Sequence, residues 1–259
     1  MSAKPRFTHV GNFTGYMKRV VEHVHDALGD SDSARVLDVP AGNGLIVDAM
    51  KSLGYDATGG DINDERDDYV KVNMEEAFPF PDGSFDAVTC LEGIEHVMDP
   101  AGLVREIARV TRPGGLIIIS TPNTMNLYSR IVFLLQGQPY QFLPSGRVHP
   151  TPGRPEDRGH IWPVSYPILR YLLQEAGCTI DGVDGDKIKR KLLMPLYIPI
   201  ILLNWIMARG GAYRTRSRNQ PELDSIRAHV LSKPLLFSRS LIVIARKNDS
   251  GGSHVEAES

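Results

Sequence analysis

Strand-like apolar segments alternate with helix-like periodic segments along most of this chain. Short apolar runs bounded by turn residues predict strands, and apolar residues at helical spacing predict amphipathic helices. The predicted strands are 35–39, 56–61, 69–74, 85–91, 116–120, 178–185 and 240–247. The predicted helices are 16–28, 44–54, 99–110 and 165–177. Such alternation favours an α/β fold, a mostly parallel sheet with helices on both faces.

Two long segments interrupt this alternation, at about 121–163 and 184–238. Long connections inside a compact domain are usually functional, so we expect both insertions to form a lid. Residues 1–246 show no internal repeat and no clear linker, which predicts a single domain. The last residues, 247–259, are polar and rich in Gly and Ser, so we predict a disordered tail.

Charge and cysteine content exclude several classes of protein. The chain has 29 Lys and Arg against 31 Asp and Glu, so nothing suggests a nucleic-acid partner. Its two cysteines, Cys90 and Cys178, have no metal-binding spacing and form no disulfide framework. The first residues lack an apolar signal core. These features predict a cytoplasmic protein.

The stretch VLDVPAGNG, residues 36–44, joins a buried strand to a glycine turn. In an open α/β sheet, ligands bind beyond the carboxyl ends of the strands. Gly42 and Gly44 let a backbone approach a ligand where a Cβ atom would collide. Asp38, just before the turn, repels phosphate but can meet an ammonium group. By itself this pattern is equally typical of a tight turn before a helix.

A second acid follows at the predicted end of the next strand, where Asp61 can accept both hydrogens of a ribose diol. A dinucleotide site would share this acid, but it requires a third glycine where this chain has Val47. The pattern therefore favours a ligand with a ribose and an ammonium group but no pyrophosphate. S-adenosylmethionine has this chemistry.

The chain resembles the class I S-adenosylmethionine-dependent methyltransferases, and particularly their ubiquinone-biosynthesis-like branch. The blocks that carry the resemblance lie between about Arg35 and Asp181, in the family's order. They are VLDVPAGNG, TGGDIN, VNMEEAFPFPDGSFDAVTCLEGIEHVMDP, REIARVTRPGGLIIISTPN and YPILRYLLQEAG. The resemblance implies a Rossmann-like, seven-stranded, mostly parallel sheet and S-adenosyl-L-methionine as cofactor.

The resemblance also implies the residues that hold this cofactor: Asp38, Ala41, Gly42, Gly44, Asp61, Ile62, Asn73, Met74, Leu91 and Glu92. The chain departs from the family's usual pattern at Pro40, where a glycine is common, and at Asn73, where an aspartate is common. The amide oxygen of Asn73 can still accept a hydrogen bond. For Asn73 and Glu92, capping of a strand end is the alternative interpretation.

The methyl donor is already activated, so the protein must mainly align the acceptor with it. If the acceptor is a hydroxyl, a base would help, and histidine is the usual choice. The candidates are His160, which ends the first insertion, and His96, which follows the fourth strand. His96 has the alternative role of capping a turn. We predict no metal site.

The run from Leu192 to Ala208 is almost wholly apolar, with Lys and Arg on both sides. Interruptions at Pro195, Pro199 and Asn204 make it too short to span a membrane. One interpretation is that 187–218 lies on an anionic membrane surface, on the inner membrane face. The alternatives are a lid or dimer interface, and an apolar acceptor pocket formed together with 126–144.

The leading functional prediction is an S-adenosylmethionine-dependent methyltransferase that O-methylates a small or lipid-linked acceptor, such as a quinone, lipid or glycan precursor. Two alternatives stay open. One is a non-catalytic, membrane-associated assembly protein with a methyltransferase-like fold. The other is an NAD(P)-dependent oxidoreductase, which Val47 disfavours.

Overall fold

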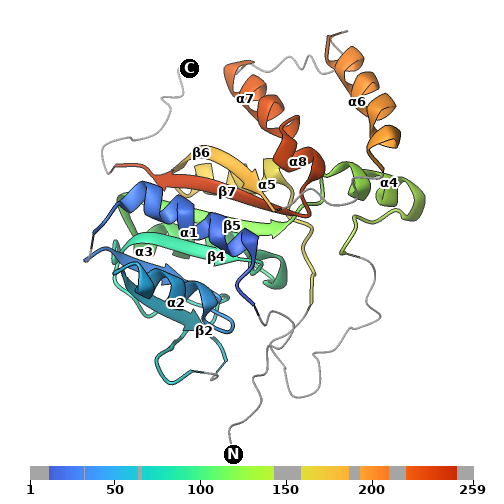
Figure 1. The fold of residues 1–259 in the computed structure, drawn as a ribbon. Helices are drawn as coiled ribbons and strands as arrows, with labels where there is room; N and C mark the ends of the chain where they lie inside the picture. The colour runs from blue at the N-terminus through green and yellow to red at the C-terminus, as the bar shows by residue number, and fades with distance from the viewer. Residues whose placement is uncertain are drawn as a thin grey trace, which may run out of the picture.

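A seven-stranded sheet forms the centre of the molecule (Figure 1). The computed structural model describes residues 12–31, 33–63, 66–142, 159–186, 193–209 and 220–249. The strands are β1 Arg35–Asp38, β2 Asp56–Asp61, β3 Val70–Lys71, β4 Phe85–Leu91, β5 Thr111–Pro122, β6 Cys178–Gly185 and β7 Ser240–Lys247. Their order is β3-β2-β1-β4-β5-β7-β6. Only β7 runs antiparallel to its neighbours, so the predicted mostly parallel Rossmann-like sheet is confirmed.

Helices cover both faces of the sheet. They are α1 Gly15–Leu28, α2 Leu45–Ser52, α3 Pro100–Val110, α4 Leu127–Gln136, α5 Tyr166–Glu175, α6 Met194–Arg209, α7 Gln220–Val230 and α8 Lys233–Phe237, with a short 3₁₀ helix, η1, at Ile94–His96. Leu116 and Ile118 of β5 pack with α1 and α2, whereas Ile117 and Ile119 pack with α3 and α5. Alternate residues of one strand therefore build the two cores.

Local signals explain several helix starts. Asp99 precedes α3 and its Oδ1 accepts from the backbone N–H of Gly102 at 2.8 Å, with Pro100 at the first helical position. An aspartate followed by a proline at the first helical position is a typical helix start. Asn126 plays the same part for α4, since its Oδ1 accepts from the N–H of Ser129 at 2.8 Å.

Some boundaries differ from the prediction. β3 has only two residues, because its partner β2 ends at Asp61, which pairs with Lys71. β5 begins at Thr111, five residues before the predicted start, and an irregularity between Phe85 and Ala87 of β4 accommodates its first residues. The predicted tail starts too early, since Lys247 belongs to β7. Residues 250–259 of that tail lie outside the described residues.

The two insertions supply α4, α6, α7 and α8, which gather beyond one end of the sheet (Figure 1). Leu127, Tyr197 and Leu236, from α4, α6 and α8, form a third and smaller apolar cluster. Within the described residues, none of the helices is both long enough and apolar enough to cross a bilayer. That these helices act as a lid remains a prediction.

Candidate active site

The carboxyl ends of β1, β2 and β4 bring several predicted site residues to one edge of the sheet. Asp38 ends β1 and is paired in register with Gly59 of β2 and Thr89 of β4. Asp61 ends β2, and Leu91 ends β4. Because these three strands are parallel and adjacent, their ends open onto the same crevice.

Asp38 is a buried carboxyl at this edge. Its Oδ1 accepts a hydrogen bond from the hydroxyl of Thr89 at 2.6 Å. Burial raises the pKa of Asp38 to about 7, and the charge of Asp61 adds to this rise. The Thr89 hydrogen bond acts in the opposite direction. A cationic ligand beside Asp38 would favour its ionised form.

Asp61 holds the glycine turn after β1. Its Oδ2 accepts from the backbone N–H of Gly42 at 2.7 Å, and its Oδ1 accepts from the N–H of Asn63 at 3.0 Å. Gly42 has a φ of 54°, and no atom lies within 4 Å of where its Cβ would be. The turn thus presents bare backbone next to a buried acid, with open space above Gly42.

Gly44 has a different reason to be glycine. Its φ is 81°, and an added Cβ would lie 2.3 Å from Nη1 of Arg66 and 2.9 Å from the hydroxyl of Tyr69. Arg66 also donates to Asp48 at 2.8 Å and to Asp68 at 2.8 Å. The positive charge of Arg66 next to the turn is therefore already balanced by two carboxylates. This balance disfavours the binding of a pyrophosphate there.

The other predicted cofactor residues lie around this edge. Ala41 is buried, and its N–H donates to the carbonyl of Gly60 at 2.9 Å. Ile62 is exposed just after β2. Asn73 accepts from the N–H of Glu75 at 3.1 Å and donates to Glu76 at 2.8 Å, so it caps a turn. Met74 and Leu91 pack against the two cores.

Glu92 follows β4 in a backbone conformation that is rare for a residue with a side chain, with a φ of 50°. Its carboxyl accepts from the hydroxyl of Ser120 at 3.3 Å and also bonds to the side chain of Ser240. Burial raises the pKa of Glu92 to about 7, whereas the charge of Arg239 lowers it. The hydroxyl of Tyr16, from α1, is hydrogen-bonded to Ser120.

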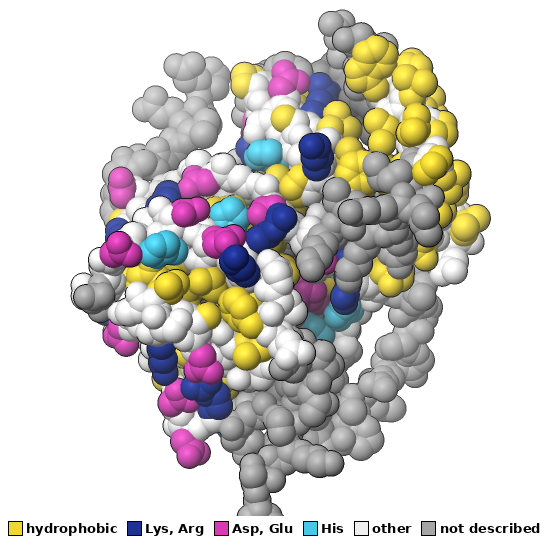
Figure 2. Space-filling view, viewed as in Figure 1, with side chains coloured by type: hydrophobic (Ala, Val, Ile, Leu, Met, Phe, Trp, Pro, Cys, Tyr) yellow, Lys and Arg dark blue, Asp and Glu magenta, His cyan; other side chains and the backbone are white. Residues whose placement is uncertain are grey.

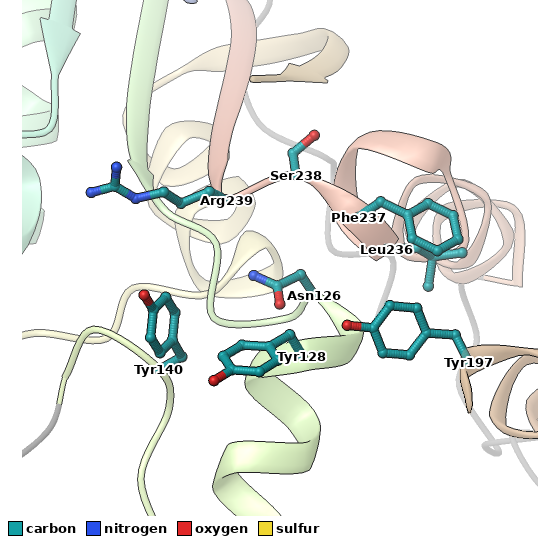
Figure 3. Close-up of a pocket in the computed structure, with 8 residues that line it drawn as sticks. All are labelled: Asn126, Tyr128, Tyr140, Tyr197, Leu236, Phe237, Ser238 and Arg239. Atoms are coloured by element: carbon teal, nitrogen blue, oxygen red, sulfur yellow. The ribbon is translucent and has the colours of Figure 1, made fainter. Parts of the chain in front are cut away.

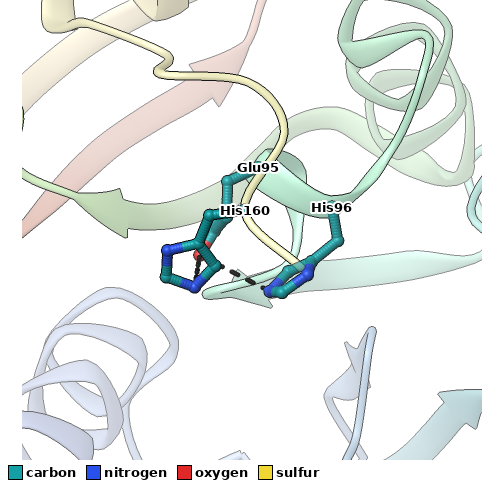
Figure 4. A group of neighbouring side chains, drawn as sticks. All are labelled: Glu95, His96 and His160. Carbon is teal, nitrogen blue, oxygen red and sulfur yellow. Dashed lines mark ion pairs between the residues drawn. The ribbon is translucent and has the colours of Figure 1, made fainter. Parts of the chain in front are cut away.

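Glu95, His96 and His160 form a cluster just beyond β4 (Figure 4). The Nε2 atoms of both histidines lie 4.0 Å from Oε1 of Glu95. The carbonyl of Glu95 accepts from the N–H groups of Ile161 at 2.9 Å and Trp162 at 3.1 Å. These two hydrogen bonds hold the segment that carries His160 against η1.

Glu95 is fully buried, and among the described residues nothing donates a hydrogen bond to its Oε1. Burial raises the pKa of Glu95 well above its ordinary range, and the charge of Glu92 raises it further. Nδ1 of His160 donates to the carbonyl of Gln141 at 3.2 Å, which leaves a lone pair on Nε2 when the ring is neutral. The cluster can therefore accept a proton or ligate a cation.

The three side chains are close enough to hold one divalent cation, since one ligand atom from each lies within 4.8 Å of the others. Carboxylate and imidazole together suit several such metals. The sequence predicts no metal site, because His160 stands about 65 residues after Glu95 and their spacing matches no metal-binding pattern.

An aromatic pocket lies next to this crevice (Figure 3). It is lined by Asn126, Tyr128, Tyr140, Tyr197, Leu236, Phe237, Ser238 and Arg239. Arg239 donates to the side-chain oxygen of Gln141 at 3.1 Å, and its charge acts on Glu92. The pocket and the end of β4 are thus joined through Arg239.

Sequence reasoning missed four residues that face this region: Tyr16, Glu95, Ser120 and Arg239. Glu95 had a signal, because it stands three residues after Glu92 and directly before His96. Arg239 lies at this site because β7 runs antiparallel, so that the amino end of β7 is next to the carboxyl ends of its neighbours. The number of strands alone does not predict this direction. Tyr16 and Ser120 carried no recognisable pattern.

Comparison with protein families matches residues 13–183 to a family described as a methyltransferase domain. Two curated relatives are ubiquinone biosynthesis O-methyltransferases. That of Alkalilimnicola ehrlichii is 34% identical over 142 residues, covering 49% of this chain and 57% of the relative. That of Dechloromonas aromatica is 36% identical over 128 residues, covering 43% and 54%. The chain spans only about half the length of these relatives.

Solved structures share the fold. A SAM-dependent methyltransferase from Archaeoglobus fulgidus aligns with a TM-score of 0.57 at 19% identity, covering 94% of this chain and 100% of that one. The [4+2]-cyclase SpnF aligns with a TM-score of 0.51 at 20% identity, covering 90% and 81%. The second case means that the fold by itself does not define the reaction.

Proposed function

The chain belongs to the class I S-adenosylmethionine-dependent methyltransferases, and we propose that it transfers the methyl group to a hydroxyl of a quinone-like acceptor. The observation that carries this proposal is the cluster of Glu95, His96 and His160, which lies at the edge of the sheet that also carries Asp38 and Asp61. The two relatives are O-methyltransferases by name, which supports oxygen as the methylated atom.

The cofactor fits the chemistry of this edge. Two buried acids, Asp38 and Asp61, suit the ammonium group and the ribose diol of S-adenosyl-L-methionine. The open space above Gly42 leaves room for a ligand against the backbone. The compensated charge of Arg66 disfavours a dinucleotide, and with it the NAD(P)-dependent alternative.

When bound, the cofactor supplies a methyl group on a positively charged sulfur. Transfer of this methyl group to an acceptor hydroxyl would break the carbon–sulfur bond, release S-adenosylhomocysteine and require the hydroxyl to lose its proton. The described residues can help this step in two ways. One histidine can take the proton as a base, or both histidines and Glu95 can hold a divalent cation that stabilises the ionised acceptor oxygen.

The buried, unpartnered oxygen of Glu95 favours the second way, because a cation would satisfy it. The aromatic side chains beside Arg239 enclose only about 10 Å³ as they stand, so a ring-shaped acceptor with an apolar substituent would bind there by separating them. The acceptor of this proposal is therefore a catechol or hydroquinone ring that carries a hydrocarbon tail.

The test is to incubate the protein with S-adenosylmethionine, Zn²⁺ and a catechol that carries a short isoprenoid tail, because two imidazoles and a carboxylate suit Zn²⁺. We expect the methyl ether and S-adenosylhomocysteine in equal amounts by mass spectrometry. Chelation of divalent cations should abolish turnover, and added Zn²⁺ should restore it. Glu95→Gln should lower the turnover rate by about 100-fold without changing cofactor affinity in calorimetry.

Glu175→Gln, an exposed acid at the end of α5, is the matched control and should behave like the parent. Turnover that resists chelation but is lost in His160→Gln would assign the histidine as a base. Binding of NADH instead of S-adenosylmethionine would support an oxidoreductase. Binding of neither would support the non-catalytic alternative.

A further inference from the structure

Helix α6 is apolar on the face that packs against α4 and α8 and also on the opposite face. Tyr197, Ile200 and Ile201 turn toward α4 and α8 within the third apolar cluster. The outer face of α6 consists of Leu196, Ile198, Leu202, Leu203, Trp205 and Ile206, all exposed. Figure 2 shows hydrophobic side chains gathered over this helix. A helix that is apolar all round is normally covered.

The end of α4 extends this surface. Phe133, Leu134 and Leu135 are exposed there, and Leu134 exposes 82% of its surface. α4 and α6 are neighbours, because Leu127 and Ile131 of α4 share the third apolar cluster with Tyr197. Exposed apolar residues on two adjacent helices mark a site of interaction rather than scattered surface residues.

The length of α6 argues against a span. Its 16 residues extend over about 24 Å, less than the roughly 30 Å of a hydrocarbon core. Pro199 lies inside the helix and removes one backbone donor. The helix can therefore lie along the surface of a bilayer, but it is too short to cross the hydrocarbon core.

The positive charges that flank α6 in the sequence favour an anionic partner. From residue 187 to residue 221 the sequence contains eight Lys and Arg and no Asp or Glu. They are Lys187, Lys189, Arg190, Lys191, Arg209, Arg214, Arg216 and Arg218. A sequence run that contains cations and no acids is typical of segments that meet anionic lipid headgroups. An anionic surface gives each cation an opposite charge.

We propose that the outer face of α6, with the end of α4, lies on an anionic lipid bilayer. The apolar side chains enter the boundary between headgroups and acyl chains, and the flanking cations meet anionic headgroups. This inference goes beyond the methyltransferase activity and does not depend on it, because binding to lipid needs neither cofactor nor acceptor.

Tryptophan fluorescence of the full chain tests the proposal. The chain has two tryptophans, so Trp162→Phe leaves Trp205 of α6 as the only reporter. Vesicles of phosphatidylcholine with roughly 30% phosphatidylglycerol should shift its emission to shorter wavelength and protect it from acrylamide. Pure phosphatidylcholine vesicles should bind at least about tenfold more weakly, and raised salt should weaken anionic binding.

Two variants separate the apolar and the charged contributions. Ile198→Asp with Leu202→Asp should abolish the shift, and both positions are exposed, so folding should be retained in circular dichroism. Arg214→Gln, Arg216→Gln and Arg218→Gln together should weaken anionic binding by at least about tenfold and leave α6 unchanged. Ile168→Asp, at an exposed apolar position of α5, is the matched control.

A protein that ignores anionic vesicles in all these assays overturns the proposal. Sedimentation velocity then identifies the occupant, since a dimer that Ile198→Asp dissociates would make this face an interface between copies. Equal binding to neutral and anionic vesicles would also contradict the assigned role of the cations.

Discussion

At the scale of single residues, the site contains buried acids. Their ionisation is unfavourable unless a cationic ligand is bound beside them. Burial raises the pKa values of Asp38 and Glu92 to about 7. A carboxyl with a raised pKa in the folded chain opposes folding when it is ionised, so acidification through these two groups does not unfold the protein. Their ionisation can instead be coupled to cofactor binding.

Cofactor affinity should therefore rise with pH below neutrality. The ionised form of Asp38 binds the ammonium group, so the dissociation constant should fall about tenfold per pH unit up to about pH 7. The amino group of the cofactor stays protonated over this range. Calorimetry between about pH 5.5 and 7 measures the effect.

Asp38→Asn gives the control for this pH dependence. It should bind the cofactor more weakly and lose most of the slope, whereas Glu92→Gln should retain it. A dissociation constant that is flat in the parent protein over this range would contradict the assignment of Asp38.

What the sequence could predict at this scale depends on whether a residue's role is local. Asp38, Gly42 and Asp61 stand at strand ends that apolar runs and glycines define, and the structure brings them together as expected. Asn73 bonds within its own turn, which is the contact that the capping alternative predicts. The unpartnered oxygen of Glu95 depends on its burial and on a segment about 65 residues later, which local patterns do not encode.

At the scale of elements, Asn123 ties the end of β5 to α8. Its buried amide group donates to the carbonyls of Pro234 at 3.2 Å, Leu235 at 3.0 Å and Ser238 at 3.0 Å. Its backbone N–H donates to the carbonyl of Arg239 at 2.8 Å. One side chain thus fixes the place where the second insertion returns to the sheet.

Asn123→Ala should lower the free energy of unfolding by about 2–4 kcal/mol, because buried carbonyls lose their donor. Urea denaturation measures this change. Asn248→Ala, at an exposed position with a side-chain contact to Thr179, should change stability by less than about 0.5 kcal/mol. Equal stability of the two variants would show that α8 does not depend on Asn123.

The elements were predictable where one pattern decided them. Asp99 and Pro100 set the start of α3, and short apolar runs set β4 and β7, which are mostly buried. The residues Arg112–Gly115 contain a proline and two glycines, which are typical of a turn. They lie within β5 because Thr111 pairs with Phe85 before a register shift, and continuous pairing with β4 begins at Leu116. The helical state of 194–209 was not predicted, because Pro195 and Pro199 obscured a run whose apolar contacts with α4 and α8 favour a helix.

At the scale of the whole molecule, the aromatic pocket connects the proposed lipid-binding surface with the proposed catalytic edge. Tyr197 comes from α6 and lines this pocket, whose far side reaches Arg239. Arg239 acts on Glu92 at the end of β4. A docked α6 would therefore place the entrance for an apolar acceptor beside the lipid in which such an acceptor dissolves.

Anionic vesicles should then accelerate methylation of an acceptor with a long hydrocarbon tail but not of the same ring without a tail. We expect kcat/KM for the tailed acceptor to rise by at least about tenfold, because the vesicle concentrates both partners on one surface. Ile198→Asp with Leu202→Asp should lose this gain and keep the rate on the tailless ring, since neither residue lines the pocket. If vesicles accelerate both acceptors equally, docking would act on the enzyme itself and not through delivery of a lipid-dissolved substrate.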